Sequence, residues 1–192
     1  MANDTTNKIL EAAFEIVAQN KISGTRMHLI AKEAGMVQSN LHYYYPTKHD
    51  LMIALLDSIQ ERFTQKRMSS VDLEEKSFVE NLQGLFYEKK DDIRNHKKID
   101  YVQFDFWVQG TVNSEIREKF KDAFDIWIKN IIEVLKKDPD FEENKSADYR
   151  MLPYLIVSIM MGASMQYLID EEKFDLDDYF TAAEKMILNF LK

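Results

Sequence analysis

Apolar side chains recur at intervals of three and four residues along most of the chain, which is the spacing of one buried face of an α-helix. In the first such stretch, residues 8–19, the positions Ile9, Ala13, Ile16 and Val17 follow this interval. No segment alternates between apolar and polar residues for long enough to predict a β-sheet. The pattern therefore predicts an all-α protein.

Glycines, prolines and polar turns divide this pattern into about nine helices. Gly35 is placed where a helix ends in a left-handed residue, and Pro46 stops the helix that precedes it. Residues 20–24 and residues 138–146, which include Pro139, are predicted to be loops. The predicted helices span residues 8–19, 27–34, 38–45, 48–68, 73–90, 98–112, 114–137, 147–170 and 175–191.

Composition agrees with a helical chain and excludes several classes of protein. Five Gly and three Pro among 192 residues are few, as in a protein built from helices. The chain has no Cys, which excludes a disulfide scaffold, thiolate metal sites and a cysteine nucleophile. The first eight residues are polar, and the longest apolar run, residues 152–165, is interrupted. We therefore expect a cytoplasmic protein without a membrane span.

Charge is distributed unevenly along the chain, whose formal net charge is −8. Residues 1–50 contain five acidic and five basic side chains, whereas residues 51–192 contain 28 acidic and 20 basic ones. The acidic part would repel DNA, and the neutral N-terminal part would not.

Two short predicted helices, joined through a glycine and ended by a proline, describe a helix-turn-helix. Ala31 is small where the two helices would cross, and Leu41 and Tyr45 would anchor the second helix to the core. The opposite face then presents Gln38, Ser39, Asn40, His42, Tyr43 and Tyr44. Glutamine and asparagine can pair with adenine in the major groove, and tyrosine and histidine suit phosphate contacts. Ordinary packing of two short helices is the alternative, but exposed aromatic residues favour a partner.

Residues 7–55 resemble the N-terminal domain of the TetR family of transcriptional regulators. The resemblance is carried by Lys8-Ile-Leu-Glu-Ala-Ala-Phe14, Thr25-Arg-Met-His-Leu-Ile-Ala31, Ala34-Gly-Met and Leu41-His-Tyr-Tyr-Tyr-Pro-Thr-Lys48. It implies a homodimeric repressor that binds a double-stranded DNA operator and is released by a small-molecule effector. It also implies a DNA-binding domain over residues 1–47 and a helical ligand-binding and dimerisation domain over residues 48–192. The second part slightly resembles choline-responsive repressors, which transfers no ligand.

The resemblance assigns DNA contacts by position. It places Gln38, Asn40 and Tyr43 at base edges, with Ser39 on the same face, and it places Thr25, Arg26, His42, Tyr44 and Lys48 at phosphates. The chain departs from the family pattern where helices two and three begin. Arg26 and Leu29 replace the usual Thr-x-x-Asp capping box, so we expect Thr25 to cap helix two. Val37 replaces the usual capping Ser, so we expect Ser39 or Gln38 to cap helix three.

Aromatic side chains gather in the second part of the chain, where they form either a core or a pocket for a lipophilic effector. The candidate ligand-binding residues are Phe86, Tyr101, Phe104, Asp105, Trp107 and Trp127. Asp105 is either a counter-charge for a cationic effector or a solvated helix residue. The last two helices either pack in the core or form a four-helix bundle with a second copy. The candidate interface residues are Leu155, Ile159, Ala163, Tyr167, Ala183, Met186 and Phe190.

Catalytic and metal chemistry find no support in the motifs. We identify no nucleophile–base pair and no phosphate-binding loop, so we expect neither an enzyme nor a cofactor. His28, His42 and His49 are separated by 14 and 7 residues, which matches no ligand spacing on one helix, so we expect no metal site. The remaining alternative is a helical interaction protein whose aromatic third helix binds another protein.

Overall fold

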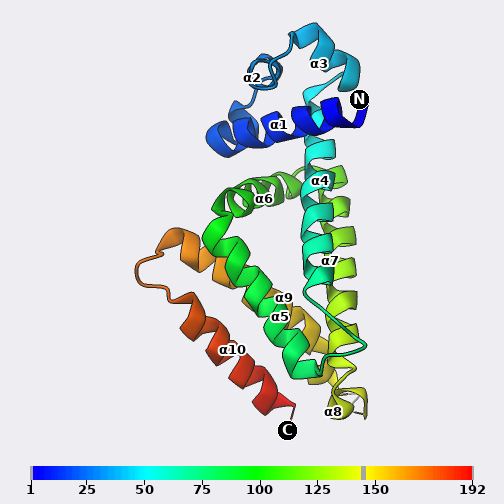
Figure 1. Ribbon diagram of the computed structural model, residues 1–192, viewed down its shortest axis with the longest axis vertical. Helices are drawn as coiled ribbons and strands as arrows, with labels where there is room; N and C mark the ends of the chain where they lie inside the picture. The colour runs from blue at the N-terminus through cyan, green and yellow to red at the C-terminus, as the bar shows by residue number, and fades with distance from the viewer. Residues whose placement is uncertain (1, 144–145, 192) are drawn as a thin grey trace. The chain divides into compact units, whose positions relative to one another are not determined.

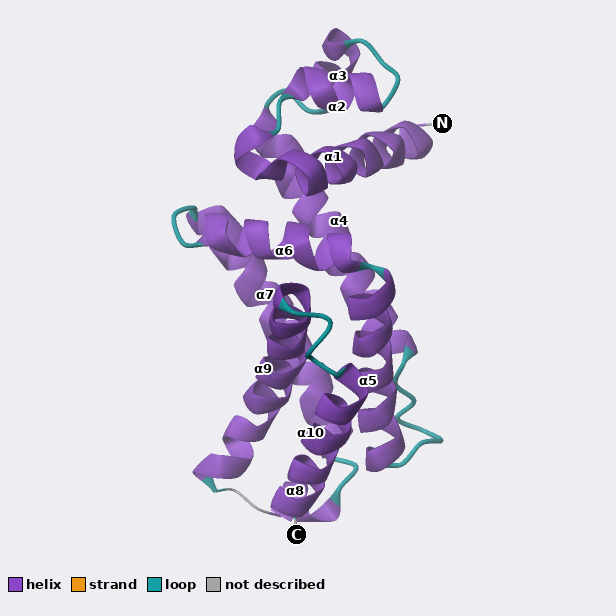
Figure 2. Ribbon diagram, turned by 90° about the vertical axis from the view of Figure 1, so that its left-hand side faces the viewer, coloured by secondary structure: helices purple, strands orange, loops and turns teal. Residues whose placement is uncertain are grey.

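The computed structural model describes residues 2–143 and 146–191, and this part of the chain forms helices and loops without a strand (Figures 1 and 2). The predicted all-α fold is therefore confirmed. The helices are α1 Ala2–Gly24, α2 Met27–Glu33, α3 Gln38–Tyr44, α4 Lys48–Ser69, α5 Phe78–Asn95, α6 Lys97–Gly110, α7 Ser114–Leu135, α8 Pro139–Glu143, α9 Ala147–Ile169 and α10 Leu176–Phe190.

Several predicted boundaries differ from the structure, and two of the differences are explained by residues that favour the start of a helix. Helix α5 begins at Phe78 and not near residue 73, because Ser77 and Glu80 form a capping box. The Glu80 carboxylate accepts from the Ser77 backbone N–H at 2.9 Å, and the Ser77 hydroxyl accepts from the Glu80 N–H at 3.3 Å. The predicted polar loop over residues 138–146 contains α8, which starts at Pro139, since proline suits the first turn of a helix. Residues 144 and 145 of that loop lie outside the described residues.

Helix α1 continues through the loop predicted over residues 20–24, but it is kinked there. Lys21 has φ 61° and ψ 165°, a backbone conformation that is essentially restricted to glycine. A strained residue of this kind persists only where its surroundings hold it in place. Tyr101 and Asp105 of α6 contact this end of α1.

The chain divides into two compact units. The first contains residues up to 62 together with 98–121, and the second contains residues 63–97 and those from 122 onward. Helices α4 and α7 each contribute to both. The domain boundary after residue 47, which the family resemblance implies, stays a prediction.

The first unit is built on the apolar face predicted for α1. Ile9, Ala13 and Val17 are fully buried, and so are Ile30 of α2 and Leu41 of α3. Helix α1 packs on α2, and α2 packs on α3. This packing fixes the direction in which the opposite face of α3 points.

The second unit has its core between α5, α9 and α10, which contact one another pairwise (Figure 1). Phe86 of α5 lies against Phe180 of α10, with ring centroids 4.9 Å apart. At the surface, Asp177 of α10 accepts hydrogen bonds from Lys90 at 2.9 Å and from Arg94 at 2.6 Å. These two hydrogen bonds lower the pKa of Asp177 to about 2, and they hold the start of α10 against α5.

Helix α9 is the one described helix that is long and apolar enough, by length and composition, to cross a membrane. Its apolar side chains include Leu152, Ile156 and Met160, which are buried in the core of the second unit. Burial of this kind is expected of a core helix, and it accounts for part of the apolar composition of α9.

Candidate nucleic-acid interface and effector cavity

The turn between α2 and α3 has the geometry predicted from its glycine. Gly35 has φ +61°, which places it in the left-handed region. The N–H of Met36 donates to the Ala31 carbonyl at 2.9 Å, and the N–H of Gly35 donates to the Lys32 carbonyl at 3.0 Å. These bonds satisfy carbonyl groups at the end of α2 and direct the chain into α3.

Neither α2 nor α3 begins with a side-chain cap, and this corrects two expectations. Arg26 and Val37 occupy the capping positions, and no side chain there accepts a hydrogen bond. Thr25 does not substitute, because its hydroxyl donates to the Lys21 carbonyl at 2.7 Å. Ser39 and Gln38 lie inside α3 and do not cap it either. The two helices are thus held by packing, through buried residues such as Ile30 and Leu41.

Helix α3 has one anchored side and one exposed side. Leu41 is fully buried, whereas Gln38, Ser39 and Asn40 are exposed. Tyr43 is 82% exposed, and its ring meets the Tyr44 ring edge-on at a centroid distance of 5.5 Å. A ring this exposed is accessible to a partner. The structure therefore places four of the predicted DNA-binding residues together on one accessible face.

His42 joins the exposed face of α3 to the turn that follows it. One ring nitrogen, Nδ1, lies 3.0 Å from the Pro46 carbonyl, and the other, Nε2, lies 3.2 Å from the Gln38 amide nitrogen. A carbonyl can only accept, so Nδ1 carries the proton and Nε2 accepts from Gln38. This pairing orients the Gln38 side chain along the exposed face.

The two residues predicted to contact phosphates at the start of α2 differ in their exposure to solvent. Thr25 is fully buried, so its side chain does not face solvent, in contrast to the prediction. Arg26 is exposed, and its Nη1 donates to the carbonyls of Ser23 at 2.8 Å and Thr25 at 3.1 Å. Only the arginine therefore presents a charged side chain at this end of the face.

Lys48 lies at the start of α4, where Thr47 and Asp50 form a capping box. The Asp50 carboxylate accepts from the Thr47 N–H at 2.9 Å, and the Thr47 hydroxyl accepts from the Asp50 N–H at 3.1 Å. The Lys48 ammonium donates to the Ile22 carbonyl at 2.5 Å. Burial lowers the pKa of Lys48, the Arg26 guanidinium lowers it further, and Asp105 opposes both effects.

The six predicted ligand-binding residues do not form one group. Tyr101, Phe104, Asp105 and Trp107 belong to α6 in the first unit, and Phe86 and Trp127 belong to the second. Asp105 accepts a hydrogen bond from the Ile22 backbone N–H at 2.6 Å, and the Lys21 ammonium lies 5.3 Å from the Tyr101 ring centroid. These two residues therefore hold the kinked end of α1. Phe86 is a core residue, and Trp107 is half exposed.

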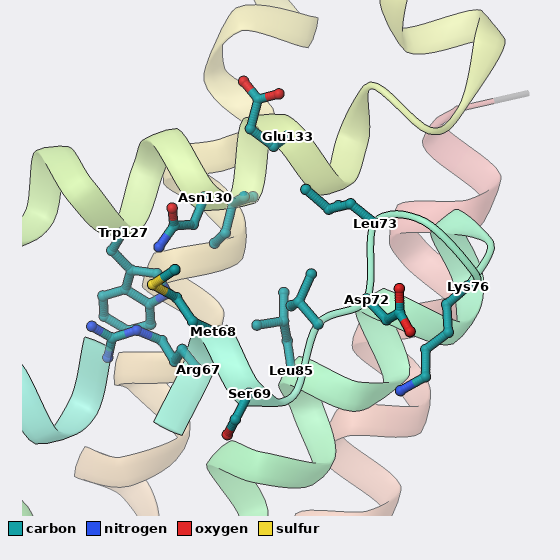
Figure 3. A pocket seen from close by; sticks show the side chains of 12 residues that line it. Arg67, Met68, Ser69, Asp72, Leu73, Lys76, Leu85, Trp127, Asn130 and Glu133 are labelled. Carbon is teal, nitrogen blue, oxygen red and sulfur yellow. The ribbon is translucent and has the colours of Figure 1, made fainter. Parts of the chain in front are cut away.

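A cavity of about 480 Å³ lies in the second unit, within the range typical of small-molecule sites (Figure 3). The end of α4, the loop that follows it, α5 and α7 form its walls. The lining residues include Arg67, Met68, Leu73, Leu85, Trp127 and Ile131. Trp127 is the one predicted ligand-binding residue among those that line it. The other lining residues were not predicted, because no sequence pattern marks the residues around a cavity formed by separate helices.

Charged side chains are buried beside this cavity. Arg67 is 8% exposed, and its guanidinium carbon lies 4.4 Å from the Trp127 ring centroid. Burial lowers the pKa of Arg67 to about 10, against the opposing charges of Glu88 and Asp92. Burial also raises the pKa of Glu88 to about 8, as does the neighbouring Asp92 carboxylate. Arg67 is therefore charged at neutral pH, and Glu88 is mostly protonated.

Exposed apolar side chains follow α9 and α10. Among the predicted interface residues, Leu155, Met186 and Phe190 are exposed, whereas Ala163 and Ala183 are buried inside the protomer. Ile159 and Tyr167 are partly buried. Four further exposed apolar residues on α9 were missed: Met151, Tyr154, Met165 and Ile169. Their separations of three, eleven and four residues place them along one side of the helix.

Comparison with known proteins identifies the exposed helix-turn-helix. The model of the family described as bacterial regulatory proteins, tetR family, matches residues 9–55. The helix-turn-helix over residues 9–55 belongs to the TetR family. The fatty acid metabolism regulator protein of Bacillus subtilis is 23% identical over 172 residues, covering 88% of this chain and 86% of that protein. This TetR-family chain is thus a transcriptional regulator and not an enzyme.

Two solved structures share the fold of this TetR-family regulator at 20% sequence identity. The regulator FadR from Bacillus subtilis, in complex with stearoyl-CoA, has a TM-score of 0.77 over 94% of this chain and 96% of its own. A transcriptional regulator from Saccharomonospora viridis, in complex with choline, has a TM-score of 0.79 over 98% of this chain and 96% of its own. At this identity the likeness concerns the fold alone.

Two acids and a histidine form a cluster at the end of α5. Ligand atoms of Asp91, Asp92 and His96 lie within 4.8 Å of one another. The Lys66 ammonium donates to both carboxylates, at 3.0 Å to Asp91 and at a shorter distance to Asp92. The lysine thus supplies the positive charge that a metal ion would otherwise bring, and the expected lack of a metal site stays a prediction.

Proposed function

We propose that this TetR-family regulator is a ligand-responsive repressor. It binds a pseudo-palindromic DNA operator as a homodimer in the cytoplasm, and a small lipophilic effector releases it. The observation that carries the DNA-binding part is the face of α3, where Gln38, Asn40 and Tyr43 are exposed on a helix anchored by Leu41. Polar and aromatic groups on the exposed side of a recognition helix are suited to the major groove.

Each side chain around α3 receives a role that follows from its chemistry. The amides of Gln38 and Asn40 read adenine edges, and Tyr43 contacts the adjacent base, with Ser39 on the same face. Arg26, His42, Tyr44 and Lys48 hold phosphates. Lys48 reaches a phosphate by exchanging its bond to the Ile22 carbonyl for one to a phosphate oxygen, in which the donor and the acceptor are both charged.

The dimer is proposed from the exposed apolar side of α9 and α10. Tyr154, Leu155, Met165, Met186 and Phe190 are each at least 39% exposed, and a second copy would cover them. A two-fold axis brings the same surface of both copies together, which suits a four-helix bundle of α9 and α10. A dimer also supplies two recognition helices, which must meet successive major grooves ~34–36 Å or a multiple of one turn apart.

The effector is proposed to bind in the cavity beside Trp127. Its walls combine apolar side chains with a few polar groups, as ligand sites do. The relatives support small-molecule control, since one is named for fatty acid metabolism and the solved structures contain stearoyl-CoA and choline. Release follows if the effector binds more tightly to the conformation that fits the operator less well.

Operator binding by α3 variants tests the DNA-binding part of this proposal. The probe is the DNA upstream of the protein's own gene, and the readout is fluorescence anisotropy over a series of salt concentrations. Gln38→Ala and Tyr43→Ala are expected to weaken binding about 10-fold or more, at about 1–3 kcal/mol per base contact, without changing the oligomeric state. Tyr87→Ala is the matched control, because Tyr87 is 72% exposed and belongs to the second unit.

Two results would contradict the proposal. Wild-type protein that binds its upstream DNA no better than unrelated DNA would refute operator recognition. Loss of the dimer in Tyr43→Ala, measured by sedimentation, would instead favour a protein partner for α3. Wild-type affinity for DNA is expected to fall steeply with salt, because phosphate contacts release counterions.

A further inference from the structure

Arg67 is a buried cation at the wall of the cavity, and its guanidinium has no anionic partner among the described residues. Its Nη2 donates to the Thr64 hydroxyl at 3.5 Å, which is a long hydrogen bond, and its Nε has no partner. No carboxylate among the described residues forms an ion pair with it. A buried charge is strongly disfavoured unless it is paired, so this guanidinium is suited to an anion that the protein does not itself supply.

The two acids nearest to Arg67 are engaged elsewhere. The Asp92 carboxylate accepts from Lys66, which also bonds Asp91. Glu88 is mostly protonated at neutral pH, because burial and Asp92 raise its pKa to about 8. Lys89, also from α5, adds another positive charge close to Glu88. The negative charge that acts on Arg67 at neutral pH is therefore mainly that of Asp92, and this carboxylate is already bonded to Lys66.

The acids on the cavity wall are likewise paired. The Asp72 carboxylate accepts from the backbone N–H groups of Glu74 and Glu75, each at 3.0 Å. Glu133 forms an ion pair with Lys136 at 2.9 Å. Figure 3 shows Arg67 and Trp127 on one side of the cavity and Asp72 and Lys76 on the other. Arg67 Nε and Trp127 Nε1, which are buried without a hydrogen-bond partner, belong to the residues on the first of these sides.

Most of the other residues that line the cavity are apolar, and Ser69 and Asn130 are the uncharged polar ones. Val71, Leu85 and Ile131 are among its lining residues. Trp127 packs its ring against the guanidinium and leaves its own Nε1 without a partner. A molecule that fits this cavity presents hydrocarbon to these side chains and an acceptor group to Arg67.

We propose that the cavity binds an amphipathic carboxylate, an unbranched hydrocarbon chain whose single carboxylate pairs with Arg67. The inference rests on the proposed function, because it takes this cavity to be the effector site, and it names the chemical class of the effector. The guanidinium offers two parallel N–H donors to the two carboxylate oxygens, a geometry that lysine does not reproduce. The hydrocarbon chain lies against Val71, Leu85 and Ile131.

The charge of the ligand is tested first, because that test needs no variant. Dodecanoate and methyl dodecanoate have the same chain, and the ester lacks the negative charge. Calorimetric titration of the wild-type protein is expected to give at least about tenfold tighter binding for the acid. Equal affinity for the ester, or no binding of the acid, would overturn the proposal.

The position of the ligand is tested with Trp127. The chain has two tryptophans, so Trp107→Phe leaves Trp127 as the sole emitter. Dodecanoate is expected to shift or quench its fluorescence. Arg67→Met is expected to weaken binding at least about tenfold, and Arg67→Lys to weaken it less, since the charge is kept. Unchanged affinity in both variants would overturn the assignment of Arg67.

Matched measurements distinguish a failure of the carboxylate proposal from a folding defect and from a failure of the proposed function. Lys76→Met removes an exposed cation from the side of the cavity opposite Arg67 and is expected to leave the affinity for dodecanoate within about threefold. If Arg67→Met fails to fold, as judged by circular dichroism, the acid–ester comparison and Arg67→Lys still decide the inference. Dodecanoate that binds at Trp127 without changing operator affinity would refute effector control and leave the carboxylate site standing.

Discussion

The backbone N–H of Ile22 donates a hydrogen bond of 2.6 Å to the carboxylate of Asp105, which joins the end of α1 to α6 within the first unit. The carbonyl of the same residue accepts from the Lys48 ammonium. Ile22 thus lies between an acid of α6 and the lysine proposed to hold a phosphate. The carboxylate predicted as a candidate counter-charge for an effector is already bonded to the protein backbone.

Removing the Asp105 carboxylate is expected to destabilise the first unit. Asp105→Ala leaves the Ile22 N–H without its charged acceptor, so we expect the free energy of unfolding to fall by about 1–2 kcal/mol. Asp125→Ala is the matched control, since Asp125 is an exposed acid that forms no hydrogen bond with the described residues. Urea denaturation measures both variants. Equal stability of the two would show that the Ile22–Asp105 bond contributes nothing.

Relieving the strain at Lys21 is expected to stabilise the protein. The backbone at φ 61° and ψ 165° is one that glycine adopts readily and other residues adopt at a cost of about 1–3 kcal/mol. Lys21→Gly should therefore be more stable than Lys21→Ala, which loses the same side-chain contact with Tyr101 but keeps the strain. Thermal unfolding of the pair isolates the backbone effect. A glycine variant no more stable than the alanine variant would contradict it.

Asn81 is expected to be needed for the loop over residues 70–77, part of which lines the cavity. Its side-chain amide donates to the carbonyls of Asp72, Lys76 and Ser77 and accepts from the Asp72 N–H at 2.7 Å. Asn81→Ala leaves these buried groups unsatisfied and should lower the free energy of unfolding by about 2–4 kcal/mol.

The control for this loop variant is Asn95→Ala, which removes an exposed amide with one side-chain hydrogen bond, to Asp91. We expect a change within about 0.5 kcal/mol for the control, as for most surface substitutions. Urea unfolding curves compare the two variants. A loss in Asn81→Ala no greater than that in Asn95→Ala would mean that the loop does not depend on this amide.

Glu88 is expected to make the protein less stable as the pH rises from about 4.5 to about 8. Its pKa is raised to about 8 in the folded protein, so the folded state binds this proton more tightly than the unfolded chain does. The stabilisation is complete below about pH 4.5 and is lost by about 1.4 kcal/mol per pH unit at most. Glu88→Gln, which is neutral throughout, should flatten this part of the profile. Parallel profiles for wild type and Glu88→Gln would contradict the assignment.

Much of the first unit could be predicted from the sequence because its determinants are local. The positive φ of Gly35, the cap at Thr47 and the burial of Leu41 each depend on residues close in the chain. The exposed face of α3 follows from the position of Leu41 by helical periodicity. The cap at Ser77 was equally local, and the Ser-x-x-Glu pattern could have placed the start of α5.

Tertiary packing decided everything that depends on residues far apart in the chain. Asp105 meets Ile22 across 83 positions, and no periodicity reports such a pair. Arg67 lies at the end of a helix with basic neighbours, where the sequence favours a solvated side chain, and only the approach of α5 and α7 buries it. Sequence alone therefore determined most of the helices and the exposed face of α3, whereas the cavity and its buried cation exist only because separate helices enclose them.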